Sequence, residues 1–140
     1  MSSNAPKWFR PVAIVALLWN LMGCAAYLAD ARLTPDDIAQ MGEAQQAMYA
    51  ARPAWAVGAT AIAVWAGAIG CLGLIFRKRW AFMALVASLA GVVFQDIALF
   101  GIMKAASAGA GVLIMQGIVL VVAILLVLLA RKGIDRGWLT

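Results

Sequence analysis

Long apolar runs alternate with short polar segments along the whole chain. Four runs are long enough to cross the ~30 Å hydrocarbon core of a membrane, which takes about 20 residues. They predict spanning helices at about 12–31, 55–76, 80–103 and 112–130. Each run has one narrow face of small residues, and such faces let membrane helices pack closely. The pattern therefore predicts an all-α membrane protein: a four-transmembrane-helix antiparallel bundle forming a single domain over residues 1–140.

The connection between the first two spans has a different pattern. Thr34, Pro35 and Asp37 form a helix start with a capping box. Apolar and polar positions then separate onto two faces, which predicts an amphipathic interfacial helix at about 35–51. One face carries Ile38, Met41, Gln45, Met48 and Tyr49; the other carries Asp36, Gln40 and Glu43. Pro53 ends this helix before Trp55 anchors span two at the membrane interface.

Composition and charge agree with membrane placement. The chain is 66% hydrophobic and only 12% charged, with a net charge of +5. Its basic residues sit at span ends and form no extended patch, so nucleic acid is not an expected partner. Three basic clusters lie before span one, between spans two and three, and after span four, while the 30–52 connection is acidic. The positive-inside rule then predicts that both termini are cytoplasmic.

The residue inventory excludes several classes of site. The chain has no histidine and only two cysteines, so ligands for a metal or haem are nearly absent and no cofactor is expected. Cys24 and Cys71 fall at different heights in their spans, which argues against a disulfide. No nucleophile–base pair is visible, so we do not expect an enzyme.

Uncharged polar side chains interrupt every span. At about 1.5 Å per residue, Tyr27, Thr60, Gln95 and Gln116 fall at nearly the same height, in the outer third of the membrane, and Asn20 lies about 10 Å deeper. This polar layer is the candidate binding site for a small polar solute. The alternative is that these side chains are only interhelical packing contacts, worth ~0.6–2 kcal/mol each.

Asp96 is a candidate of a different kind. A charged side chain at this depth costs ~2.5–3.5 kcal/mol on insertion scales. We expect it either to be neutral or to meet a cation, of which Lys104, Arg32 and Arg52 are nearest in height. It points about 120° away from the small-residue face of its own helix. It therefore lies at a second interface or reaches outward, and both functional and structural roles stay open.

Several motifs resemble a group of small bacterial inner-membrane proteins. The likeness covers about residues 6–95 and rests on "LLWN", "AYLADARLTPDDIAQMGEAQQAMYAARPAW", "AIAVWAGAIGCLGL", "RKRWA" and "SLAGVVFQ". The shared positions are Trp19, Asn20, Pro53, Trp55, Gly67, Gly70 and Gln95. Members of the group are often labelled sugar transporters. The resemblance implies a multi-pass protein of the bacterial inner (cytoplasmic) membrane.

Two functions are consistent with the sequence. The first is a carrier, or carrier subunit, for a small sugar-like solute, with Asn20, Tyr27, Gln95 and Gln116 as hydrogen-bonding groups, Trp19 as a stacking surface and a homodimer supplying extra volume. The second is a non-catalytic accessory, assembly or regulatory subunit of a larger membrane complex. In that case Asp96 would meet a cation of the membrane-protein partner.

Overall fold

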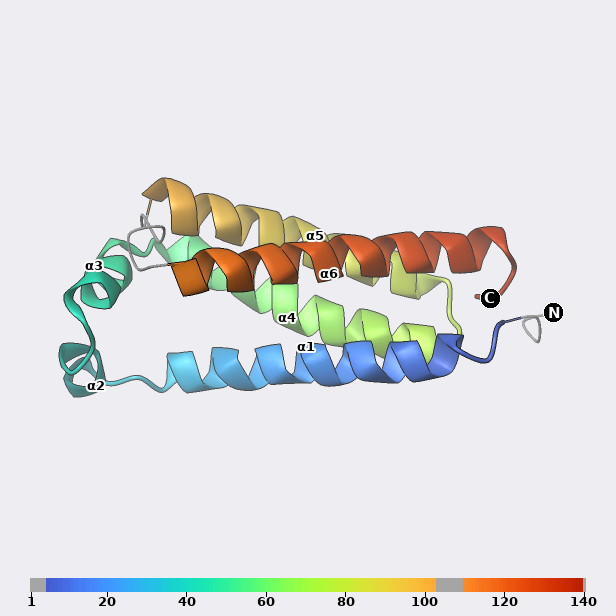
Figure 1. Ribbon diagram of the computed structural model, residues 1–140, viewed down its shortest axis with the longest axis horizontal. Coiled ribbons are helices and arrows are strands. Elements are labelled where there is room, and N and C mark those ends of the chain that lie inside the picture. Colours follow the sequence, from blue (N-terminus) through green and yellow to red (C-terminus); the bar gives the residue numbers. More distant parts are fainter. Residues whose placement is uncertain (1–4, 103–109, 140) are drawn as a thin grey trace.

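The computed structural model describes residues 5–102 and 110–139, and the regular elements in these ranges are helices. Four are long: α1 (Phe9–Ala31), α4 (Ala54–Ile75), α5 (Trp80–Asp96) and α6 (Ala110–Asp135). Two short helices, α2 (Pro35–Ala39) and α3 (Glu43–Ala51), connect α1 to α4, and a π-helix, η2 (Ile97–Ile102), continues α5. The four long helices run side by side, with both termini at one end and α2 and α3 at the other (Figure 1).

The all-α four-helix architecture predicted from the apolar runs is confirmed. Four helices are long and apolar enough to cross a membrane, as in a multi-pass membrane protein. The described helices begin and end within a few residues of the predicted spans, except that α1 starts at Phe9 and α6 continues to Asp135. The turn expected between the last two spans falls on residues 103–109, outside the described residues.

Helix α4 is central to the packing. It lies against α5 on one side and α1 on the other, while α6 packs on α5. Small residues make these approaches possible, as the sequence predicts. An added Cβ at Gly91 would lie 2.7 Å from both the carbonyl oxygen of Ala59 and the amide nitrogen of Ala63 on α4. No side chain larger than glycine fits between the two helices at this crossing.

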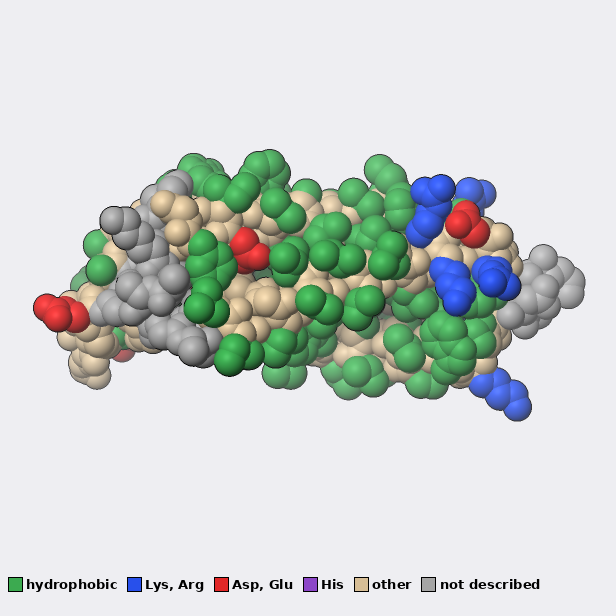
Figure 2. All heavy atoms as spheres, turned by 45° about the horizontal axis from the view of Figure 1, so that its top comes forward, with side chains coloured by type: hydrophobic (Ala, Val, Ile, Leu, Met, Phe, Trp, Pro, Cys, Tyr) green, Lys and Arg blue, Asp and Glu red, His purple; other side chains and the backbone are tan. Residues whose placement is uncertain are grey.

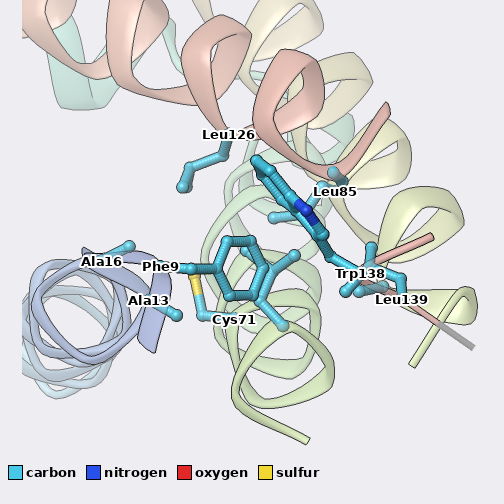
Figure 3. Close-up of a cluster of buried hydrophobic side chains, with 11 residues drawn as sticks. Phe9, Ala13, Ala16, Cys71, Leu85, Leu126, Trp138 and Leu139 are labelled. Atoms are coloured by element: carbon cyan, nitrogen blue, oxygen red, sulfur yellow. The ribbon is translucent and has the colours of Figure 1, made fainter. Parts of the chain in front are cut away.

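The main hydrophobic core sits at the end that carries the termini. All four long helices and the C-terminal tail contribute to it (Figure 3). Phe9 of α1 packs against Trp138 of the tail, with ring centroids 5.6 Å apart. The members of the buried cluster are Phe9, Ala13, Ala16, Cys71, Leu74, Ala81, Leu85, Leu126, Ala130, Trp138 and Leu139. This core closes one end of the bundle.

The tail reaches the core through a Schellman turn at the end of α6. The amide of Trp138 donates to the carbonyl of Gly133 (2.7 Å), and that of Gly137 donates to Ile134 (3.2 Å). Gly137 has φ +76°, a conformation in which a Cβ would be strained. The turn reverses the chain, so Trp138 and Leu139 are buried although they lie beyond the apolar span.

The segment expected as one interfacial helix at about 35–51 is divided into α2 and α3. The predicted capping box is present: Thr34 Oγ1 accepts from the amide of Asp37, and Asp37 Oδ2 accepts from the amide of Thr34. Gly42 then begins α3 as its N-cap. The Gln46 side chain donates to the carbonyls of Ala39 and Met41, so the break leaves these oxygens satisfied.

Charges separate toward the two ends of the bundle. Lys and Arg side chains gather at the end that carries the termini, and apolar side chains cover the middle (Figure 2). We call this the basic end. It carries the core described above and the Arg77–Arg79 turn. The opposite end, with α2 and α3, carries Asp36, Asp37 and Glu43 and is called the acidic end.

Candidate functional site

A cavity of about 600 Å³ lies inside the bundle, lined by all four long helices and by α3. Its volume is within the range of small-molecule sites, roughly 300–1,000 Å³. Five of the six candidate residues line it: Asn20, Tyr27, Thr60, Gln95 and Gln116. The polar side chains that the sequence places at similar heights on separate spans are therefore brought together in one space. The sixth candidate, Asp96, is not among its lining residues.

Two glutamines form the centre of the polar layer. Gln95 Nε2 on α5 donates to Gln116 Oε1 on α6, at 3.0 Å. A glutamine has two donors and an acceptor with two lone pairs, so this one bond leaves Gln95 Oε1 and the Gln116 amide protons to serve a solute. Both side chains are half-buried. Tyr27 and Thr60 line the same cavity from α1 and α4, and the Thr60 hydroxyl also bonds the carbonyl of Ala56 on its own helix.

Asn20 lies deeper, toward the basic end. Its Nδ2 donates to the carbonyl of Ala16 (2.8 Å) and to Cys71 Sγ (3.4 Å), which fixes the orientation of the amide. The Asn20 carbonyl oxygen then lies against Gly67 of α4, where an added Cβ would overlap it. Ser88 of α5 lies nearby and donates to the carbonyl of Ala63 at 2.6 Å. These bonds hold a polar amide at a defined position in an otherwise apolar wall.

The acidic end of the cavity is covered by a hydrogen-bonded cluster. Asp30, at the end of α1, accepts from the Tyr49 hydroxyl and from Arg52 Nη1, both at 2.7 Å. The Arg52 guanidinium also lies 4.9 Å from the centroid of the Tyr49 ring. Burial, then the hydrogen bond to Asp30 and its charge, raise the pKa of Tyr49 to about 12, against the opposing effect of Arg52. Tyr49 is therefore a neutral donor at physiological pH.

One face of the connecting segment also covers the acidic end of the cavity. Met41, Gln45 and Tyr49, predicted to share one helical face, all line the cavity. This face therefore contacts the bundle itself, and the position of the segment at the membrane interface stays a prediction. Arg52, one of three cations considered for Asp96, pairs with Asp30 instead, because α3 carries it to the end of α1. Lys104 lies outside the described residues.

Apolar side chains line the floor of the cavity, at its basic end, and much of its side wall. Leu85 and Leu126 line the cavity and also belong to the core at the basic end, so that core forms the floor. Above it, α6 presents mainly aliphatic side chains. The apolar lining includes Ala63, Val64, Val92, Val119, Val122 and Ala123. The cavity therefore combines a few polar groups at fixed positions with a large apolar surface, the usual composition of a small-molecule site.

Asp96 lies in a separate groove of about 400 Å³ that also involves Leu120 of α6. This position agrees with the prediction that it points away from the small-residue face. Its Oδ1 atom is buried and has no hydrogen-bond partner among the described residues. The π-helix begins at the next residue. The other residues of the groove are apolar apart from Gly101: Val93, Ile97, Phe100 and Leu120.

Residues outside the polar layer also contribute to the cavity, among them Trp19, which was expected as a stacking surface. Trp19 lines the cavity, although its helical position lies about 100° from the centre of the polar face. The Asp30–Tyr49–Arg52 cluster was not predicted. The signal for it in the sequence is the pair of opposite charges, Asp30 and Arg52, at the two ends of the connection between the first two spans. The cysteines Cys24 and Cys71 are both free thiols, in agreement with the prediction.

The site is suited to reversible hydrogen bonding with an uncharged molecule. Among the described residues, the charged side chains that line it, Asp30 and Arg52, form an ion pair with each other. In residues 5–102 and 110–139, no three His, Cys, Asp or Glu side chains are grouped in a way that could hold a metal ion. No protein-family model, curated protein or solved structure matches the chain. Function is therefore inferred from the cavity and its side chains.

Proposed function

We propose that the protein is a solute carrier of the membrane, or the solute-binding subunit of one, and that the cavity holds the solute. The observation that carries this proposal is the convergence of polar side chains from all four long helices on one cavity. If these side chains served only in pairwise packing, they would have no reason to surround a shared space of about 600 Å³. Free donors and acceptors at Gln95 and Gln116 provide the recognition.

The solute is expected to be uncharged and rich in hydroxyl groups. A buried ion needs an opposite charge, and the two charges at the acidic end of the cavity, Asp30 and Arg52, are already paired with each other. Amide and phenol groups donate and accept hydrogen bonds, which suits hydroxyl groups that do both. A sugar-like molecule meets these requirements, and Trp19 offers an aromatic surface for its apolar face.

The orientation proposed for the carrier places both termini in the cytoplasm of a bacterial cell. Lys7 and Arg10, the Arg77–Arg79 turn, and Arg131, Lys132 and Arg136 all belong to the basic end. Cytoplasmic loops of membrane proteins carry such an excess of Lys and Arg. The covered end of the cavity then faces outward, and the hydrophobic core separates the cavity from the cytoplasm.

Proteoliposomes test the carrier function directly. Purified protein is reconstituted and assayed for uptake and equilibrium binding of neutral sugars. Asn20→Ala and Gln116→Ala are expected to weaken binding about tenfold each, since each removes a hydrogen bond to the solute. Gln40→Ala is the matched control, because Gln40 is exposed and does not line the cavity. Binding without uptake identifies a solute-binding subunit; the absence of both contradicts the proposal.

Asp96 favours a second candidate function, that of an accessory subunit of a membrane complex. A carboxyl group with an unpaired, buried oxygen in an apolar groove is costly in lipid. A partner helix bearing Lys or Arg at the same height would satisfy it. Affinity purification from native membranes in mild detergent should then recover a partner that is lost with Asp96→Asn. Asp135→Asn is the control, because Asp135 is exposed and ion-paired with Arg131.

A further inference from the structure

A side-chain cluster lies at each end of the bundle cavity, and the sides between the helices are not all closed. At the acidic end, Tyr49 and the Asp30–Arg52 pair cover it. At the basic end, Leu85 and Leu126 belong to the core that Phe9 and Trp138 complete. A ligand that arrives along the bundle axis would have to pass one of these clusters. The sides of the cavity between the helices are therefore the place to look for an opening.

Helices α1 and α6 leave such an opening. Helix α1 packs on α4, and α6 packs on α5, but α1 and α6 hardly approach each other in the described residues. Both helices nevertheless line the cavity. Met22 of α1 is 67% exposed and Met115 of α6 is 52% exposed, yet each is also a lining residue. A side chain that is exposed and also lines the cavity lies at the rim of an opening. Met22 and Met115 therefore lie at the two edges of the opening between α1 and α6.

This opening faces the hydrocarbon of the membrane. Met22 and Met115 lie within the apolar stretches of two membrane-spanning helices, and Met115 directly precedes the polar-layer residue Gln116. Water and a fully hydrophilic solute are scarce at this depth, whereas the acyl chains of lipids fill it. Methionine side chains are flexible and can adapt to such chains. The route into the cavity is therefore lateral and apolar, while its interior carries hydrogen-bonding groups.

Resting on the solute-binding function proposed above, we infer that the ligand is an amphiphile with an uncharged, hydroxyl-bearing head group that enters sideways from the bilayer between α1 and α6. The head group hydrogen-bonds Gln95, Gln116 and Tyr27 in the polar layer. Its apolar chain lies along the aliphatic face of α6 and passes out between Met22 and Met115. The combination of a lateral apolar opening with an uncharged polar interior selects this class of molecule.

Photo-crosslinking in lipid nanodiscs tests the inference. The probe is an alkyl glucoside with a diazirine in its chain, and crosslinked residues are identified by mass spectrometry. We expect crosslinks at cavity-lining residues of α1 and α6 that excess n-octyl β-glucoside abolishes. Free glucose should compete only at much higher concentration, because it lacks the chain, and dodecylphosphocholine should not compete, because its zwitterionic head group carries a phosphate and an ammonium charge.

Two neighbouring alanines provide a matched pair of variants. Ala26 is exposed and lines the cavity, whereas Ala25 is exposed and does not. Ala26→Phe narrows the opening and should reduce the competed crosslinks about tenfold. Ala25→Phe should leave them unchanged. Crosslinking at the lipid-facing Leu18, equal in both variants, reports that the bundle is intact.

The outcomes separate the inference from the function on which it rests. Competition by glucose as effective as by octyl glucoside, with no effect of Ala26→Phe, overturns the lateral amphiphile but leaves a solute site. Competition by dodecylphosphocholine as well overturns the selectivity for an uncharged head group. Crosslinks confined to lipid-facing residues and competed by none of the three compounds, together with no glucose binding, overturn both.

Discussion

The amide oxygen of Asn20 on α1 occupies the space that a side chain at position 67 on α4 would fill. An ideal Cβ on Gly67 would overlap Asn20 Oδ1 and lie 3.0 Å from Ser88 Oγ. The amide is held in this position by its bonds to Ala16 and Cys71. The absence of a side chain at one residue therefore sets the position of a polar group at another.

Gly67→Ala is expected to displace the Asn20 amide and weaken ligand binding about tenfold. The added methyl group cannot be accommodated unless the amide rotates away from its two hydrogen bonds. Gly58→Ala on the same helix is the control, because nothing lies within 4 Å of a Cβ built there. Equilibrium binding to both variants checks the prediction, and equal affinities would count against a role for Asn20 in the cavity.

Gly91→Ala should destabilise the bundle by ~1–3 kcal/mol, as overpacking of a closely fitted contact usually does. The clash is with backbone atoms of Ala59 and Ala63, which cannot move without shifting α4. Gly117→Ala meets nothing within 4 Å and should leave the stability unchanged or slightly improved. Thermal unfolding in detergent compares the two variants. A Gly91→Ala protein as stable as the parent would mean that α4 and α5 pack less closely than described.

Trp138→Ala should cost about 3–5 kcal/mol of folding free energy, the usual range for removing a large buried aromatic side chain. Trp138 is 8% exposed and packs on Phe9, so its loss opens the floor of the bundle. Trp65→Ala, at a site 41% exposed, is the matched control and should change stability far less. Denaturation of both variants by sodium dodecyl sulfate measures the difference. Similar losses would show that the tail is not part of the core.

Because of Tyr49, the free energy of unfolding is expected to change with pH in the alkaline range. Its pKa is about 12 in the folded protein, against 10.0 for an ordinary tyrosine, mainly because burial disfavours the phenolate. Between these two values the folded state binds more protons than the unfolded state, so stability falls as pH rises from 10 to 12 and is fully present below 10.

Absorbance titration checks this prediction. The chain has two tyrosines, so a Tyr27→Phe variant isolates the phenol of Tyr49. Its pKa should be near 12 and should fall when Asp30→Asn removes the negative charge that faces it. Tyr49→Phe should abolish this part of the alkaline loss of stability. Titration of Tyr49 at its ordinary pKa would contradict the half-buried Asp30–Tyr49–Arg52 cluster.

The parts of the structure that depend on local pattern were predictable from sequence. The spans follow from apolar run length, and the close contacts at Gly70 and Gly91 follow from small-residue faces. The approach of Gln95 to Gln116 follows from counting helical rise from the ends of neighbouring spans. In each case the helix repeat and the membrane thickness are enough for the prediction, because they fix the height of each residue in the membrane and the direction in which its side chain points.

Features set by tertiary contacts were not predictable in the same way. The division of the 34–52 segment depends on Gly42 and on the Gln46 side chain bonding back to Ala39 and Met41. Burial of Trp138 depends on the chain reversal at Gly137, beyond the apolar span. The separation of α1 from α6 depends on how α4 and α5 pack, and periodicity within one helix carries no information about it.

The most direct test of the cavity as a ligand site is a crystal structure of the protein purified together with its native membrane lipids. We expect electron density for a bound molecule with polar atoms in hydrogen-bond distance of Gln95 and Gln116, and with an apolar part between Met22 and Met115. A structure in which α1 packs directly on α6, with Met22 touching Met115 and the cavity closed, would contradict the account.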